Sequence, residues 1–168
     1  MRDISLTTMK RAARVLDKLL ICTVQGAAAL CFLGVVCLVS YGVIARFLLR
    51  KGTAWGEELP LFFNVWFSML AVPLVLRQRG HIAVEFFIRL LPSKARDIFK
   101  KCVDLLIFAF SGYLVWYGIQ IVSVSMKARM ATVKWPLGFF YLSVPIGGIA
   151  AVLISLGLLL ELVSDKKP

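Results

Sequence analysis

Four long stretches without charged residues divide this 168-residue chain, and they constrain its fold more than any other feature. The second stretch, residues 59–76, holds 18 uncharged residues and would form a helix about 27 Å long, close to one hydrocarbon thickness. The first, residues 19–45, holds 27 and would be about 40 Å long, so it should tilt or project beyond the hydrocarbon. A composition that is 60% hydrophobic and 17% charged is typical of a polytopic membrane protein.

We therefore predict an all-α membrane protein with a single domain over residues 1–168. The predicted transmembrane helices cover about 19–46, 57–77, 103–126 and 135–161. The basic segment before the first span resembles the start of a signal peptide, but the apolar run that follows is too long, so we expect an uncleaved span. Residues 10–18 are expected to form a short amphipathic lead-in at the membrane surface.

The segment from about 83 to 101 is too charged to span but is amphipathic. Apolar residues recur there at three- and four-residue spacing, while Glu85, Arg89, Arg96 and Lys100 occupy the opposite face. We predict an interfacial helix in the headgroup plane, broken near Pro92, with Ser93 capping its second piece. A connector helix packed on protein is the alternative.

The lysine and arginine distribution predicts the orientation of the chain. The N-terminal segment, the second connection and the tail together carry 14 of these residues, and the first and third connections carry 6. Because cytoplasmic segments are enriched in Lys and Arg, both termini should be cytoplasmic. We therefore attribute the net charge of +11 to membrane topology and to contact with lipid headgroups, and not to nucleic-acid binding.

Two adjacent carboxylates, Glu57 and Glu58, are the sharpest polar feature. On a helix they point about 100° apart, so they cannot form a facing catalytic pair. Negative charge at a helix N-terminus is favourable by itself, and pairing with Arg46 or with another subunit is the functional alternative. Arg46 could equally snorkel to the interface. Glu57, Asn64 and Ser68 lie near one helix face, and we expect that side to face protein because intramembrane polar groups need partners.

Two further groups of residues are candidates for packing and anchoring. Ser143, Gly147, Ala151 and Ser155 repeat every four residues and predict a smooth helix-packing ridge, within the chain or with a partner. A second set of residues is expected to anchor the chain at the membrane interface and not to form a proton relay: Trp55, Arg77, Arg79, His81, Glu85, Arg89, Arg96 and Lys100.

The chain lacks residues that several classes of function would need. The four cysteines include no CxxC pair, and a single histidine cannot supply two axial ligands to haem. We find no nucleophile–base arrangement, phosphate loop or metal cluster, and so predict no catalytic, cofactor or metal residues. The spans also lack a mid-depth charge or an inverted repeat, which are marks of a carrier core.

From Val43 to Pro92 the chain resembles the small membrane subunit of tripartite ATP-independent periplasmic (TRAP) transporters. The residues that carry the resemblance are Arg46-Phe47, Trp55-x-Glu57-Glu58-Leu59, Trp66, Arg79-Gly80-His81-Ile82-x-Val84-Glu85 and Leu91-Pro92. Trp135-Pro136, Tyr141 and Pro145-x-Gly147 are similar to that family's fourth span. Pro60 and Asn64 are departures from the pattern.

The resemblance implies a non-enzymatic scaffold in the bacterial inner membrane. Its partners would be a large elevator-type membrane subunit, which carries sodium and an organic anion such as a dicarboxylate, sialic acid or another sugar acid, and a periplasmic substrate-binding protein. Docking of that binding protein is a possible role of the outer basic residues: Arg50, Lys51, Lys127, Arg129 and Lys134. An autonomous small transporter or channel, and a membrane redox enzyme using the cysteines, are the alternatives.

Overall fold

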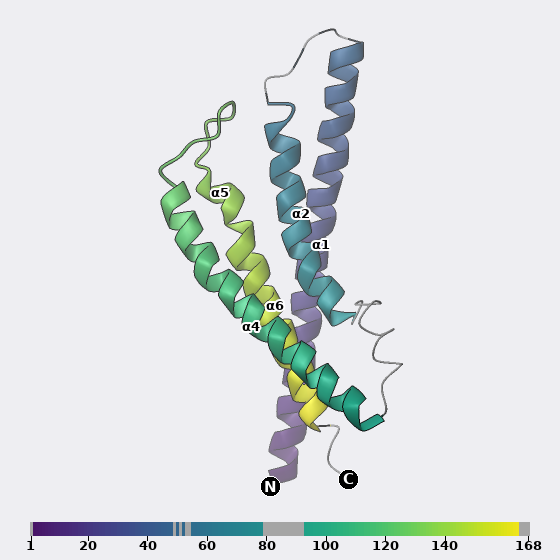
Figure 1. Ribbon diagram of the computed structural model, residues 1–168. Coiled ribbons are helices and arrows are strands. Elements are labelled where there is room, and N and C mark those ends of the chain that lie inside the picture. The colour runs from purple at the N-terminus through teal and green to yellow at the C-terminus, as the bar shows by residue number, and fades with distance from the viewer. Residues whose placement is uncertain (1, 49, 51, 53–54, 79–92, 165–168) are drawn as a thin grey trace.

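The fold is built from helices. The computed structural model describes residues 2–48, 50, 52, 55–78 and 93–164. Its elements are α1 (Arg2–Phe47), α2 (Glu58–Arg77), α4 (Ser93–Ser125), the short α5 (Gly138–Tyr141) and α6 (Ser143–Ser164) (Figure 1). Among these described residues, four segments are long and apolar enough to cross a membrane: Lys18–Phe47, Glu58–Arg77, Lys101–Ser125 and Gly138–Leu159. The predicted all-α membrane protein with four spans is confirmed.

The helices that contain the first and third spans extend well beyond those spans. α1 runs without interruption from Arg2, so residues 10–18 continue the axis of the first span and do not form a separate surface helix. α4 begins at Ser93 and continues through the third span, so residues 93–101 are joined to that span. Residues 83–92 of the predicted interfacial helix lie outside the described residues. With 33 residues, α4 is about 50 Å long and extends well beyond one hydrocarbon thickness.

The fourth span begins later than predicted and is divided. Trp135 lies in the preceding loop, and the helix is interrupted at Leu142, between α5 and α6. Proline explains the interruption, because Pro145 has no amide hydrogen to donate to the carbonyl of Tyr141, four residues before it. The amides of Leu142 and Ile146 still donate to the carbonyls of Gly138 and Leu142, at 2.9 and 3.3 Å, so the chain keeps its direction.

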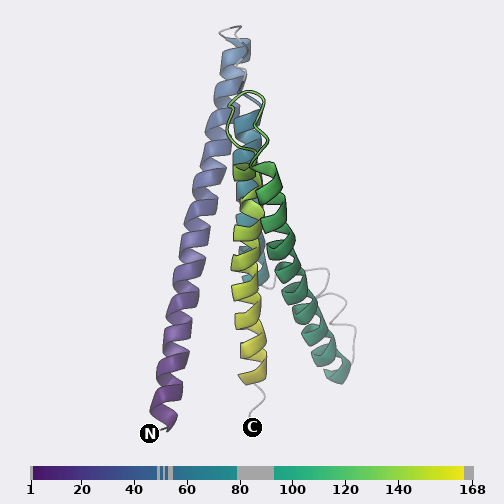
Figure 2. The ribbon, with the colours of Figure 1, turned by 90° about the vertical axis from the view of Figure 1, so that its left-hand side faces the viewer.

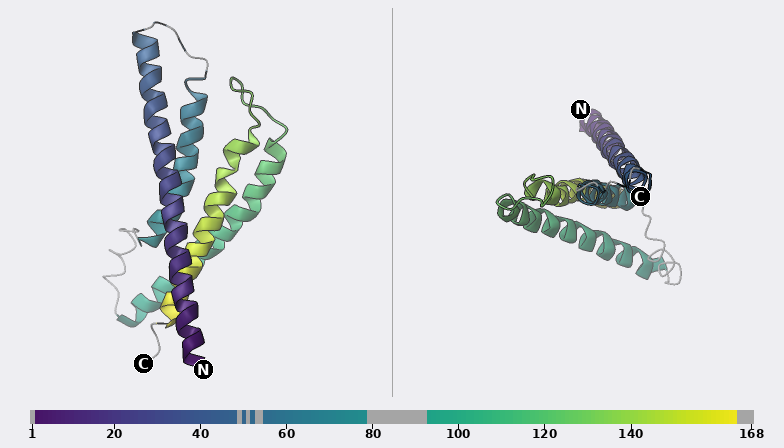
Figure 3. Two further views of the ribbon diagram at one scale, coloured as in Figure 1. Left: turned by 180° about the vertical axis from the view of Figure 1, so that it is seen from behind. Right: turned by 90° about the horizontal axis from the view of Figure 1, so that it is seen from above.

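The helices form two antiparallel pairs that are joined mainly through α2 and α6. α1 lies beside α2, and α4 lies beside α6, while α2 and α6 join the pairs (Figure 1). The connections from α1 to α2 and from α4 to α5 lie at the end opposite both termini, which we call the hairpin end (Figure 1). Viewed along the long axis, α2 and α6 lie between α1 and α4 (Figure 3). A side view shows α1 and α4 splayed to either side of α6 (Figure 2).

Two neighbouring glycines let α6 approach both α2 and α4 closely. A Cβ atom on Gly147 would lie 2.6 Å from the carbonyl oxygen of Met69 in α2. A Cβ atom on Gly148 would lie 3.0 Å from Cγ2 of Val115 in α4. Because adjacent helical residues point about 100° apart, each glycine serves a different neighbour. Gly118 of α4 makes a matching space for Pro145, where a Cβ atom would lie 2.9 Å from the proline Cδ.

The predicted ridge lies inside this arrangement. Ser143, Gly147, Ala151 and Ser155 are all buried, and the hydroxyls of the two serines donate to the carbonyls of Phe140 and Val152 within the same segment. Toward the terminal end, α6 adds the buried side chains of Ile154 and Leu158, which pack with Leu76 and Ala151. Partly buried side chains of α1 and α4 complete this cluster: Leu20, Ile21 and Ile107. The ridge is therefore a contact within the chain.

Most of the remaining apolar surface is uncovered. The chain exposes 12302 Å², whereas surface scaling gives about 8,300 Å² for a compact soluble monomer of this mass. Large apolar side chains are exposed on α1 and α4, among them Leu30 and Leu106, each 70% exposed. This surface must be covered by lipid or by another protein.

We expect Gly147→Ala to destabilise the fold by about 1–3 kcal/mol, because its methyl group would meet the Met69 carbonyl and push α2 from α6. Gly157→Ala on the same helix is the matched control, since a Cβ atom there meets nothing within 4 Å. That control should be neutral or stabilising by up to about 1 kcal/mol, because alanine favours helix. Thermal unfolding in detergent would measure both, and equal midpoints for the two variants would contradict the proposed contact.

Candidate functional site

The beginning of α2 is prepared by a turn over residues 55–57. The amides of Leu59 and Leu61 donate to the carbonyls of Trp55 and Glu57, each at 3.3 Å, and α2 begins at Glu58. Pro60 is the third residue of the helix, where no intrahelical donor is needed. The carboxylate of Glu58 thus sits at the positive end of the helix dipole.

Glu58 binds the loop that joins α4 to α5. Its two carboxylate oxygens each accept from the amide of Thr132 at 3.0 Å, and Oε2 also accepts from the amide of Val133 at 3.1 Å. Successive amides that point at one anion form a small anion-binding concavity, filled here by a side chain of the same molecule. One carboxylate therefore joins α2 to a segment 74 residues away in the sequence.

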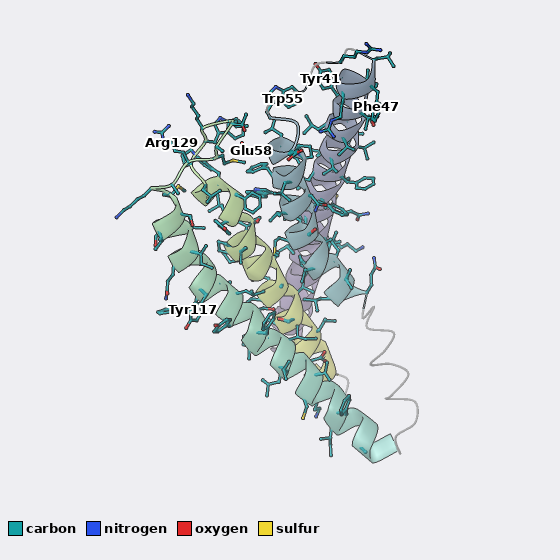
Figure 4. The ribbon with its side chains drawn as sticks, turned by 45° about the horizontal axis from the view of Figure 1, so that its top comes forward. Tyr41, Phe47, Trp55, Glu58, Tyr117 and Arg129 are labelled. Atoms are coloured by element: carbon teal, nitrogen blue, oxygen red, sulfur yellow. The ribbon has the colours of Figure 1, made fainter. Side chains whose placement is uncertain are left out.

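The loop is shaped to present those amides. Its two sides are joined by hydrogen bonds from Met130 to the Trp135 carbonyl and from Leu137 to the Ala128 carbonyl, both 2.9 Å. Lys134 adopts a left-handed conformation with φ of 59°, which closes the turn. Nη1 of Arg129 donates to the Lys134 carbonyl at 3.3 Å. Figure 4 shows Arg129 and Glu58 at the same end of the molecule.

Aromatic side chains extend this contact into the span. The ring of Phe62 in α2 lies 6.1–6.4 Å, between centroids, from the rings of Trp66, Trp135 and Phe140. Nε1 of Trp66 donates to the carbonyl of Phe139 at 3.2 Å. We call Glu58, Phe62 and Trp66, with the loop amides and rings that they contact, the clamp. It joins the two helix pairs at the hairpin end of the molecule.

The neighbouring carboxylate, Glu57, points toward α1, within its own helix pair. Its Oε1 lies 3.8 Å from Nη2 of Arg46 in α1, and the two side chains are 90% and 70% exposed. An exposed pair at this distance stabilises little. A second tie between the same segments is the stacked pair of Tyr41 and Trp55, whose centroids lie 5.6 Å apart at 11° (Figure 4).

The remaining predicted residues divide into three groups. Asn64 and Ser68 lie on an exposed face of α2. Arg50, Lys127, Arg129 and Lys134 are exposed at the hairpin end, and Lys51 lies outside the described residues. Of the expected inner anchors, Arg77 is half-buried at the end of α2, and the side chains of Arg96 and Lys100 are not among those described. Arg79, His81, Glu85 and Arg89 lie outside the described residues.

Sequence reasoning missed the contact between Glu58 and the loop, and the role of Gly148. Backbone amides carry no residue-type signal, so the partner of Glu58 could not be found from the sequence. Within the described part of the chain, no group of three or more His, Cys, Asp or Glu residues could hold a metal ion. The four cysteines are free, and none of them belongs to the clamp.

Comparison with known proteins identifies the family. Residues 35–165 match the model described as tripartite ATP-independent periplasmic transporters, DctQ component. The chain belongs to the DctQ family. The matched residues include α2, α4, α5 and α6, and with them the whole clamp and the glycine contacts of α6.

Relatives of this DctQ-family chain are of two lengths. It is 21% identical to a putative TRAP transporter small permease protein of Haemophilus influenzae, covering 94% of this chain and 91% of that protein. It is 24% identical to the isethionate TRAP transporter permease protein DctMQ of Oleidesulfovibrio alaskensis over 71% of this chain, and 27% identical to the sialic acid TRAP transporter permease protein SiaT of Haemophilus influenzae over 46%. The chain covers only 20% and 13% of those two longer relatives.

We expect Glu58→Gln to release the α4–α5 loop, because a neutral amide is a weaker acceptor than a carboxylate for the same amides. Hydrogen exchange at Thr132 and Val133 should quicken by roughly an order of magnitude. Glu57→Gln is the matched control, since Glu57 contacts Arg46 and not the loop. Equal exchange in the two variants would show that Glu58 does not hold the loop.

Replacing Trp66 by phenylalanine should destabilise the protein by about 1 kcal/mol, because the hydrogen bond to the Phe139 carbonyl is lost. Trp116→Phe is the control, because Trp116 is 68% exposed on α4 and makes no hydrogen bond within the described part of the chain. Thermal unfolding in detergent compares the two variants. A larger loss for Trp116→Phe would argue against the clamp.

Proposed function

We propose that this chain is the non-catalytic scaffold subunit of a TRAP-type secondary transporter. The observation that carries the proposal is that α2 is joined to the other helix pair at both of its ends. The clamp joins α2 to the α4–α5 loop at the hairpin end, and the Leu76–Ala151–Ile154–Leu158 cluster joins α2 to α6 at the other. Helix pairs joined at both ends form a rigid unit, which suits a subunit that supports another protein without changing shape itself.

The distribution of charge supports the same role. Within the described spans, acidic and basic side chains occur only near the ends: Lys18 and Arg46 in α1, Glu58 and Arg77 in α2, Lys101 and Asp104 in α4. Carriers of ions and anions place charged groups and broken helices near mid-depth. The interruption at Leu142 lies near the N-terminal end of the fourth span, only a few residues after its start at Gly138.

The partner in this proposal is the large membrane subunit, which would carry sodium and an organic anion by an elevator-type movement. Two relatives are named as permease proteins of TRAP transporters for isethionate and sialic acid, and this chain corresponds to only a small part of each. Those names support an organic-anion substrate. A periplasmic binding protein would deliver the anion, and the exposed Arg50, Lys127, Arg129 and Lys134 provide positive charge at the hairpin end.

The proposed location is the bacterial inner membrane, with both termini in the cytoplasm. The bias of Lys and Arg toward the terminal end supports this orientation. The hairpin end would then face the periplasm, and the basic segment before the third span would contact anionic headgroups of the inner leaflet. The scaffold would hold the fixed part of the large subunit at a constant depth while the transport part moves.

Reconstitution in liposomes tests the proposal. We expect sodium-driven uptake of an organic anion only when this chain, the large subunit and the binding protein are all present. Proteoliposomes with this chain alone should show no uptake above empty liposomes. Uptake by this chain alone would instead support an autonomous small transporter or channel, and uptake by the large subunit alone at the full rate would remove the scaffold role.

A further inference from the structure

One face of α2 is left open along the whole span. The exposed residues recur at three- and four-residue spacing and form a single stripe, which we call the α2 stripe: Glu57, Leu61, Asn64, Ser68, Val72 and Val75. The other sides of α2 are occupied. Phe67 contacts Phe32 of α1 with 5.3 Å between ring centroids, and Met69 lies against Gly147 of α6. The stripe is therefore the one direction in which α2 lacks a neighbour within the described chain.

The stripe carries polar groups deep into the span. At 1.5 Å per residue, Asn64 lies about 9 Å and Ser68 about 15 Å along the helix from Glu58. Since α2 has 20 residues, Ser68 is at its middle. A carboxamide and a hydroxyl at these depths would face hydrocarbon if lipid covered the stripe.

Neither polar group has a partner within the described chain. The side chains of Asn64 and Ser68 make no hydrogen bond there, whereas Ser111, Ser143 and Ser155 each donate to a carbonyl of their own segment. Lipid tails offer neither donors nor acceptors, so an uncovered asparagine amide is costly in hydrocarbon. Covering it with a polar group of another protein removes that cost.

The spacing of the stripe matches a helical partner. Leu61, Ser68 and Val75 are seven residues apart, as are Glu57 and Asn64. A seven-residue repeat keeps one face toward a neighbouring helix in a left-handed crossing, which is the common crossing in membrane bundles. Small and β-branched residues, such as Ser68, Val72 and Val75, permit close approach, while one asparagine can define the register.

We propose that the α2 stripe is the surface on which a transmembrane helix of the large permease subunit docks, and that this helix hydrogen-bonds the Asn64 amide. This inference rests on the proposed function. The occupant follows from the longer relatives, in which the region similar to this chain is part of a permease polypeptide several times its length. In those relatives, the region similar to this chain is therefore part of the same polypeptide as the rest of the permease.

Site-specific photocrosslinking tests the docking surface. A benzophenone amino acid is placed at Asn64 or Ser68, and the chain is co-expressed with the large subunit and irradiated in membranes. Gln120, an exposed polar residue on α4, is the matched control position. We expect adducts with the mass of the two subunits together from positions 64 and 68, at least tenfold more abundant than from position 120.

Asn64→Leu and Gln120→Leu form a second matched pair, because each replaces an exposed carboxamide in a span by the same apolar side chain. Recovery of the large subunit with the tagged chain should fall about three- to thirtyfold for Asn64→Leu and remain unchanged for Gln120→Leu. The midpoint of thermal unfolding of the isolated chain reports whether Asn64→Leu still folds, and crosslinking at Ser68 in the otherwise unchanged chain does not depend on that variant.

The outcomes separate the two proposals. If the large subunit co-purifies with the unchanged chain but positions 64 and 68 give no adduct with it, the docking surface is refuted and the scaffold function stands. Adducts between two copies of this chain, or crosslinks to lipid alone, also refute the docking surface. If the unchanged chain recovers no large subunit at all, the proposed function fails first.

Discussion

The close approach of α6 to both of its neighbours is the contact on which the rest of the structure depends. In lipid, apolar side chains gain little by leaving hydrocarbon for one another, so helices associate through tight packing and hydrogen bonds. Gly147 and Gly148 supply the packing on two sides of one helix, against α2 and α4. Without them, the two helix pairs would have only the clamp and the small cluster near the terminal end to join them.

The clamp uses a different kind of interaction at the opposite end. The loop between α4 and α5 has amides that form no regular secondary structure, and near a membrane boundary such groups need acceptors. Glu58 supplies two oxygens for this purpose, and Trp66 adds a hydrogen bond nearer the span. Close packing at the glycines joins α2 to α6 within the span. The Glu58 carboxylate joins α2 to the α4–α5 loop at the hairpin end. Together these contacts hold the two helix pairs as a single unit.

The sequence was sufficient to predict the number of spans and their approximate positions, because charged residues mark their ends. It also identified one face of α6, because Ser143, Gly147, Ala151 and Ser155 repeat at helical spacing. Gly148 is not part of such a repeat of small residues, so the side of α6 that packs on α4 could not be predicted. The boundary expected near residue 101 rested on a change in polarity, yet no proline or glycine lies between Ser93 and Ser111, and the backbone had no reason to stop there. The partner of Glu58 was hidden because it consists of amides that every residue possesses.

The central position of α6 has a consequence for how the protein is made. α6 is made after α1, α2 and α4, yet α2 and α4 both pack on it. The α1–α2 pair can assemble as soon as α2 has been inserted, with Phe63 against Gly34 and Phe67 against Phe32. The side of α4 that packs on α6 then stays open to lipid or to the insertion machinery until α6 has been inserted. A nascent chain that stops before Ser143 would therefore contain α1, α2 and α4 but not the helix that joins α2 to α4.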